Sequence, residues 1–120
     1  PCAIFRLAFA CRGLGKRAAA IEYFIWCIEI DPTLADAYTA LGELLVGADE
    51  SEEAVRHLRQ GLKHHPEDTA IEFVLSAALF FSGEIEEAEF YVRKVLEKDP
   101  DNKSALGGLE MILAAKQKQD

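Results

Sequence analysis

Three prolines recur along the chain at a fixed distance of 34 residues. Each follows a polar residue, in the dipeptides Asp31-Pro32, His65-Pro66 and Asp99-Pro100. A period of this length is typical of an array, in which supersecondary units of one kind stack on their neighbours instead of folding around one central core. The spacing of the prolines therefore predicts a repeat protein.

The segments between the prolines have the composition and spacing of helices. Ala, Leu and Glu are in excess, and apolar residues follow one another at distances of three and four, as at Ala88, Val92 and Val95. Midway between the prolines a second set of residues recurs, where a helix is expected to end in a left-handed residue. These residues are Gly15, Asp49 and Gly83. Each period predicts a helix, a turn and a second helix, so the chain is predicted to be all-α.

The periods share further positions when they are aligned. Ile4, Leu7, Ala8 and Cys11 align with Tyr38, Leu41, Gly42 and Leu45, and then with Glu72, Leu75, Ser76 and Leu79. With an Ala later in each period and the final Pro, the chain resembles the tetratricopeptide repeat family, whose pattern is W-x2-L-G-x2-Y, then A-x3-F, then P. The Trp slot departs from that pattern, because it holds Ile4, Tyr38, Glu72 and Leu106. Glu72 weakens the match of the third repeat.

The resemblance implies one domain over residues 1–120, built as a right-handed α-solenoid of antiparallel helix pairs. Full repeats are expected at about 1–34, 35–68 and 69–102, followed by a capping helix at about 103–118. The end of that last helix is polar, as required where a stacked array meets water. At the other end, Pro1 follows no initiator Met and an apolar helix starts at once, so we expect further helices upstream.

Charge and hydropathy disfavour several classes of protein. Thirteen Lys and Arg against 21 Asp and Glu leave a formal charge of −8 and a pI near 4.9, which disfavours binding to nucleic acid or anionic lipid. No apolar stretch reaches the roughly 18 residues of a membrane span. Cys2, Cys11 and Cys27 form neither a C-x-x-C pair nor an even disulfide set, which favours a reducing, cytoplasmic compartment.

Signals for catalysis or for a bound cofactor are nearly absent. The sequence has no phosphate loop, no G-x-S-x-G and no H-E-x-x-H motif. His57 and His64 share a helical face, but two turns of helix place them roughly 10 Å apart, too far to share one metal ion. We therefore predict a non-enzymatic protein without metal or cofactor.

The first helix of each repeat carries a second stripe of residues, beside the core stripe. In the family that the chain resembles, this face lines a concave groove that binds extended peptides or partner helices. The expected groove residues are Phe5, Arg6, Phe9, Arg12, Thr39, Glu43, Val46, Phe73, Val74, Ala77, Phe80, Phe81, Gly107, Gly108 and Met111. Family members that clamp the carboxylate ends of chaperones need Asn and Lys on this face. The chain has neither there, so an apolar partner is expected.

Several alternatives remain open at this stage. The phenylalanines either pack on one another and on the capping helix, or form an exposed patch for a partner. Gly107 and Gly108 either allow close approach of Phe80 and Phe81, or keep a seat free for a partner. Residues 70–81 are apolar on every side and are expected to be buried on every side. A binding scaffold is favoured over a self-assembly module or a secretion-type chaperone that shields apolar segments.

Overall fold

The computed structural model describes residues 2–119, and within this range the chain forms seven helices and no strand. The helices are α1 (Cys2–Gly13), α2 (Arg17–Ile30), α3 (Ala35–Gly47), α4 (Ser51–His64), α5 (Thr69–Phe81), α6 (Ile85–Lys98) and α7 (Lys103–Gln119). The turn residues predicted from the period have positive φ angles, of 77° at Gly15, 63° at Asp49 and 94° at Gly83. The all-α solenoid prediction is confirmed.

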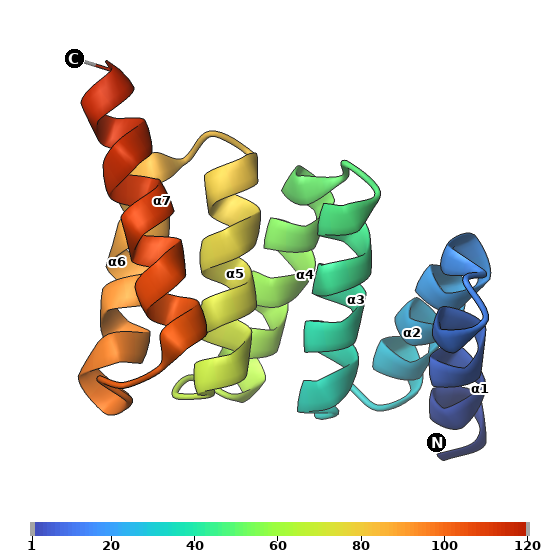
Figure 1. Ribbon diagram of the computed structural model, residues 1–120. Helices are drawn as coiled ribbons and strands as arrows, with labels where there is room; N and C mark the ends of the chain where they lie inside the picture. Colours follow the sequence, from blue (N-terminus) through green and yellow to red (C-terminus); the bar gives the residue numbers. More distant parts are fainter. Residues whose placement is uncertain (1, 120) are drawn as a thin grey trace.

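The helices stand side by side in two layers (Figure 1). One layer holds α1, α3, α5 and α7, and the other holds α2, α4 and α6. Each helix of the second layer packs against its own partner in the repeat and against the first helix of the next repeat. The result is an elongated molecule of 46 × 26 × 22 Å. The last helix, α7, covers α6 and the edge of α5, as expected of a capping helix.

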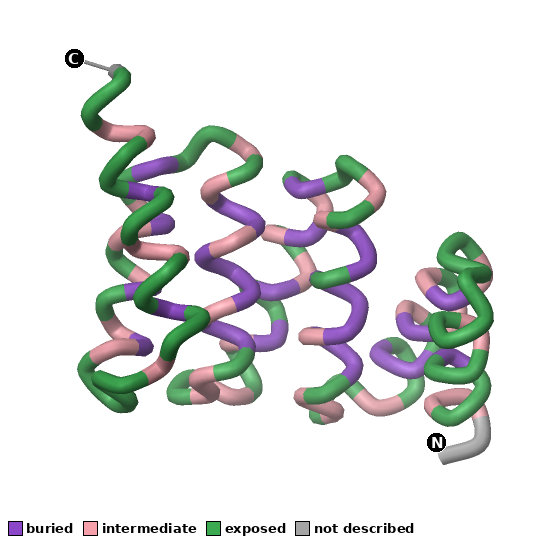
Figure 2. The backbone as a smooth tube through the Cα atoms, in the orientation of Figure 1, coloured by how far each residue is buried: buried purple, intermediate pink, exposed green. Residues whose placement is uncertain are grey.

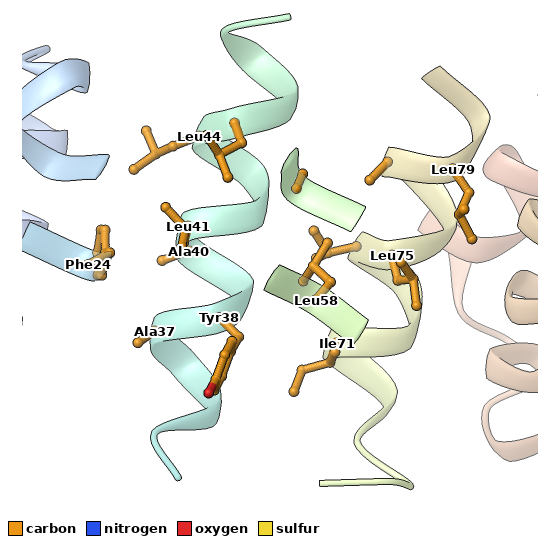
Figure 3. Packing of buried hydrophobic residues seen from close by; sticks show 14 of the residues in the cluster. Phe24, Ala37, Tyr38, Ala40, Leu41, Leu44, Leu58, Ile71, Leu75 and Leu79 are labelled. Carbon is orange, nitrogen blue, oxygen red and sulfur yellow. The ribbon is translucent and has the colours of Figure 1, made fainter. Parts of the chain in front are cut away.

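Buried residues concentrate on α3 and α5 in the middle of the molecule, and fewer lie on the outer helices (Figure 2). In the close view of Figure 3, Leu41 of α3, Leu58 of α4 and Leu75 of α5 form a continuous core across two repeats. Phe24 of α2 extends this core toward the first repeat. Because each repeat contributes one layer, the core runs along the molecule and has no single centre.

Close helix crossings explain the small residues of the repeat. A Cβ atom added at Gly42 would lie 2.9 Å from both methyl carbons of Leu58. In the equivalent slot of the third repeat, the Ser76 hydroxyl donates a hydrogen bond to the carbonyl oxygen of Ala88, over 2.8 Å. Alanines in the second helices, such as Ala54, are fully buried at the same crossings. Small residues are therefore required where the two helices of a repeat approach.

The Glu in the Trp slot of the third repeat is buried and paired. Glu72 is fully buried on α5, and its Oε1 atom accepts a hydrogen bond from Lys98 Nζ over 2.9 Å. Lys94 Nζ lies 3.2 Å from the other carboxylate oxygen. Lys98 also contacts the Glu67 carboxylate, and these hydrogen bonds raise the pKa of Lys98. Two lysines of α6 therefore compensate the acid that weakens the family pattern.

Candidate functional site

An open pocket of about 360 Å³ lies between α5 and α7. It is lined by Phe73, Ser76, Ala77, Phe80, Phe81, Lys103, Ser104, Gly107, Gly108, Met111 and Ile112. We call it the α5–α7 pocket. It gathers all the expected groove residues of α5 and α7 except Val74, and these come from the separate segments 73–81 and 107–111.

The wall of the α5–α7 pocket is mostly apolar. The only side chains with polar atoms in its lining are Ser76, Ser104 and Lys103, and the Ser76 hydroxyl is already bonded to a backbone carbonyl. Phe81 is 60% exposed and Met111 is 53% exposed, so both present apolar surface to solvent at the pocket. Exposed apolar surface next to a concavity is the usual mark of a site for a partner.

The two glycines of α7 leave the pocket open. A Cβ atom built at Gly107 would meet no atom within 4 Å, and one at Gly108 would make only ordinary contacts of 3.8 Å to Phe73 and Val92. Neither Phe80 nor Phe81 approaches these positions. Close approach of those two rings is therefore not the reason for the glycines, and the free space above Gly107 belongs to the pocket.

Ion pairs fix α7 against the rest of the molecule. Lys116 Nζ lies 2.7 Å from Glu89 Oε1 and 3.6 Å from Glu86 Oε2, both on α6. The hydrogen bonds from Lys116 and Arg93 hold the pKa of Glu89 below its usual range, and the bond to Glu89 raises the pKa of Lys116. The wall of the pocket that α7 provides is thus tied to α6 rather than resting on apolar contacts alone.

A second concavity adjoins the α5–α7 pocket at the end of α5. It has a volume of about 630 Å³ and is lined by Val46, Asp49, Glu50, Ser51, Glu52, Glu53, Phe81 and Ser82. We call it the acidic hollow. Phe81 lines both concavities, so the apolar and the acidic surface meet at this side chain. Among the acids of the hollow, Glu53 forms an ion pair with Arg56 over 3.1 Å.

The expected groove residues of α1 lie apart from this pocket. Phe5 and Phe9 pack edge to face on one another, with ring centroids 4.8 Å apart, and both pack on the buried Phe24. Arg12 lies over the ring of Phe9 and 3.8 Å from Glu43 of α3. Phe5 is half-buried by this packing, whereas Phe9 remains 38% exposed, so the rings pack on one another and still leave part of Phe9 at the surface. Arg6 is exposed on α1.

Three further groove predictions fall in different places. Val74 is buried, and its Cγ1 atom would lie 3.0 Å from a Cβ at Gly42, so it belongs to the core between α3 and α5. Its assignment to the groove was wrong, because the face of α5 that packs on α3 is wider than the core stripe alone. Thr39 is half-buried and donates to the Asp36 carbonyl, and Val46 lines the acidic hollow.

The expectation that α5 is buried on every side was also wrong. Phe81 is exposed and Phe73, Ala77 and Phe80 are half-buried, because this face meets the open α5–α7 pocket instead of another helix. An apolar sequence does not show whether its last face is covered by the chain or left for a partner. Lys103 and Ile112 are pocket residues that the spacing argument left out, although Ile112 follows the same helical period as Ser104 and Gly108.

The histidine and cysteine side chains of the molecule are dispersed. Within residues 2–119, no three His, Cys, Asp or Glu side chains come together as metal ligands. Burial lowers the pKa of the half-buried His57 and raises the pKa of the buried Cys27 thiol. Cys11 is half-buried, and the side chain of Cys2 lies outside the described residues. In this same part of the chain, no helix has both the length and the apolar character needed to cross a bilayer.

Comparison with known proteins identifies the repeat. Family models described as tetratricopeptide repeat match residues 48–112 and residues 3–34. No curated protein matches the sequence. Among solved structures, the first tetratricopeptide domain of Spaghetti (RPAP3) bound to the HSP90 peptide SRMEEVD superposes with a TM-score of 0.90 at 21% identity, covering 96% of this chain and 91% of that one.

Two further solved structures have the same architecture. The second tetratricopeptide domain of human RPAP3, in complex with the HSP70 peptide SGPTIEEVD, has a TM-score of 0.85 at 23% identity and covers 91% of each chain. MamA has a TM-score of 0.84 at 15% identity, with 92% of this chain and 64% of that chain covered. At these identities the likeness is one of fold.

Proposed function

The chain belongs to the tetratricopeptide repeat family, and on this premise we propose that it is a non-enzymatic scaffold that binds an apolar segment of a partner protein. The bound segment is a helix or an extended peptide, and it places an apolar side chain in the α5–α7 pocket. We also propose a cytoplasmic location, which agrees with the free thiols of Cys11 and Cys27.

The observation that carries this proposal is the empty space above Gly107. Glycine inside a helix costs about 1 kcal/mol relative to alanine, and at Gly107 no neighbouring atom requires the absence of a side chain. The stability of the domain therefore does not explain this glycine. A pocket that must stay open for the side chain of a partner does explain it, and Phe81 and Met111 supply apolar contact surface beside it.

The partner proposed here differs from the acidic peptides bound by two of the similar structures. Those peptides end in Glu-Glu-Val-Asp. On this chain, Arg12 is already paired with Glu43, and Lys103 is the one basic side chain that lines the α5–α7 pocket. A single lysine beside a largely apolar wall provides little to hold a run of carboxylates, so an apolar anchor is the better match to this pocket.

Selection of peptides on two matched variants tests the proposal. A random-sequence peptide library displayed on phage is selected on the wild-type protein, and the enriched peptides are then bound to Gly107→Leu and to Ala114→Leu. Leucine at Gly107 fills the pocket, whereas Ala114 is exposed on α7 outside it. We expect Gly107→Leu to lose binding and Ala114→Leu to keep it. Equal binding to both variants would show that the pocket is not the site.

Self-assembly is a second candidate, favoured by an exposed stripe on α1. Leu7 is 45% exposed, whereas Leu41 and Leu75, in the same slot of the next two repeats, are fully buried by the preceding helix pair. Leu14, in the turn that follows α1, is 75% exposed. A second copy could cover this stripe. Light scattering across a range of concentrations should then show a dimer that Leu7→Glu abolishes, and a monomer throughout would refute this candidate.

A further inference from the structure

The α5–α7 pocket does not end in neutral surface. At Phe81 it meets the acidic hollow, whose lining includes Asp49, Glu50, Glu52 and Glu53. A segment that places a side chain beside Phe81 therefore has its neighbouring residues within reach of these carboxylates. The chemistry of the hollow limits which partner sequences can continue past the apolar pocket.

The acidic hollow keeps a net negative charge after neighbouring positive groups are taken into account. Glu53 is paired with Arg56, and the N-terminus of α4 offsets about half of a unit charge. Asp49, Glu50 and Glu52 have no ion pair among the described residues. Roughly two and a half negative charges therefore face the hollow. Elsewhere, Glu72, Glu87 and Glu89 are matched by lysines or arginines of neighbouring helices.

We infer that the segment bound by this protein carries a bulky apolar residue next to Lys or Arg residues, with the apolar side chain in the α5–α7 pocket and the basic side chains over the acidic hollow. This inference rests on the function proposed above and adds the charge of the partner. An acidic segment would place like charges together, and a neutral one would leave the hollow unmatched.

Peptides from the library selection provide the first test, because they are recovered without any assumption about charge. We expect the enriched sequences to combine an aromatic or long aliphatic residue with two or more Lys or Arg. Binding of a labelled enriched peptide, measured by fluorescence anisotropy, should weaken as salt rises from about 0.05 M to about 0.5 M, since exposed charges are then screened. This salt dependence is measured on the wild-type protein and needs no variant.

Charge reversal provides the second test, with a matched control. Glu50→Lys/Glu52→Lys reverses two exposed acids of the hollow, and Glu22→Lys/Glu29→Lys reverses two exposed acids of α2, with the same change in net charge. We expect the first pair to weaken peptide binding about tenfold or more and the second pair to leave it nearly unchanged. Circular dichroism verifies that each variant is folded, and Glu50→Gln/Glu52→Gln replaces a variant that is not.

The outcomes separate this inference from the function on which it rests. The basic partner would be overturned, and the apolar pocket retained, by enriched peptides that lose binding to Gly107→Leu but are neutral or acidic. The same conclusion would follow if their binding did not change with salt or with charge reversal. Peptides that bind Gly107→Leu as well as wild type, or a selection that enriches no sequence, would overturn both. Self-association that competes with peptide binding would identify a second copy of the chain as the occupant and would overturn the basic partner.

Discussion

The same substitution, Gly to Ala, should change stability differently at two helical positions. A Cβ atom at Gly61 of α4 would lie 2.8 Å from Cγ of Tyr38, closer than carbon atoms approach in real structures. Tyr38 cannot move away easily, because it is fully buried and its hydroxyl donates a hydrogen bond to the Pro32 carbonyl over 2.9 Å. At Gly107 of α7 the added Cβ would meet nothing within 4 Å.

The two substitutions share one energetic contribution and differ in another. Replacing a helical glycine by alanine stabilises a helix by about 1 kcal/mol at either position. At Gly61 the clash adds an overpacking cost of about 1–3 kcal/mol. Gly107→Ala should therefore stabilise the protein by about 1 kcal/mol, and Gly61→Ala should be between neutral and about 2 kcal/mol destabilising. The difference between the variants isolates the overpacking cost, because the helix propensity cancels.

Thermal unfolding followed by circular dichroism measures this difference. In a domain of this size, 1 kcal/mol corresponds to about 4 °C in Tm, so the two variants should differ by about 4–12 °C. Urea unfolding provides the free energies at one temperature. Equal stabilities of the two variants would refute the reasoning. They would mean that α3 and α4 move apart at no cost in free energy and that packing against Tyr38 does not require a glycine at position 61.

Three other predictions concern charge, the pocket and metals. Acidification should weaken the attachment of α7, because hydrogen bonds from Lys116 and Arg93 lower the pKa of Glu89 in the folded protein. This ion pair stabilises the fold at pH values above the unfolded pKa of about 4.3, and the stabilisation is lost as the pH falls through the folded pKa. The free energy of unfolding of Lys116→Met in urea should therefore depend less on pH in this range. Phe80→Glu should abolish peptide binding with the helical circular dichroism signal retained, and a collapsed Tm would show that Phe80 is part of the core. Dialysis against a chelator should leave Tm unchanged, and a metal retained at fixed stoichiometry would refute this.

Much of the fold could be predicted because residues of the same kind recur at the same positions of each repeat. The positions of Asp49 and Gly83 were predictable as left-handed turn residues from their spacing alone, and both have positive φ. Burial of Leu41 and Leu75 followed from their shared slot. Contacts between particular side chains were harder to predict from the sequence. Nothing in the spacing of Gly61 indicates that it faces Tyr38, since this pair is specific to one repeat.

The site was less predictable than the fold, because a helical stripe does not reveal which neighbour covers it. Ala77 and Phe80, two of the expected groove residues, line the α5–α7 pocket. Val74 is buried against Gly42 of α3 and does not line the pocket. Phe9 lies on the equivalent stripe of α1, where it packs on Phe24 and stays 38% exposed. Sequence period gives the stripe, and the local packing decides whether it is surface.

The Trp slot shows how one array tolerates very different residues at a single position. In the second repeat the slot holds the large Tyr38, and α4 has a glycine, Gly61, opposite its ring, where a Cβ atom would clash with Tyr38. In the third repeat the slot holds Glu72, and α6 supplies Lys94 and Lys98 to a carboxylate that has no contact with water. Replacing both partners of such a pair by apolar residues is often neutral, whereas losing one partner leaves a charge without compensation. A residue in the Trp slot is therefore compatible with the solenoid only together with its contact residues on the second helix of the repeat. A comparison with the family pattern at the slot alone underestimates how well the third repeat fits this fold.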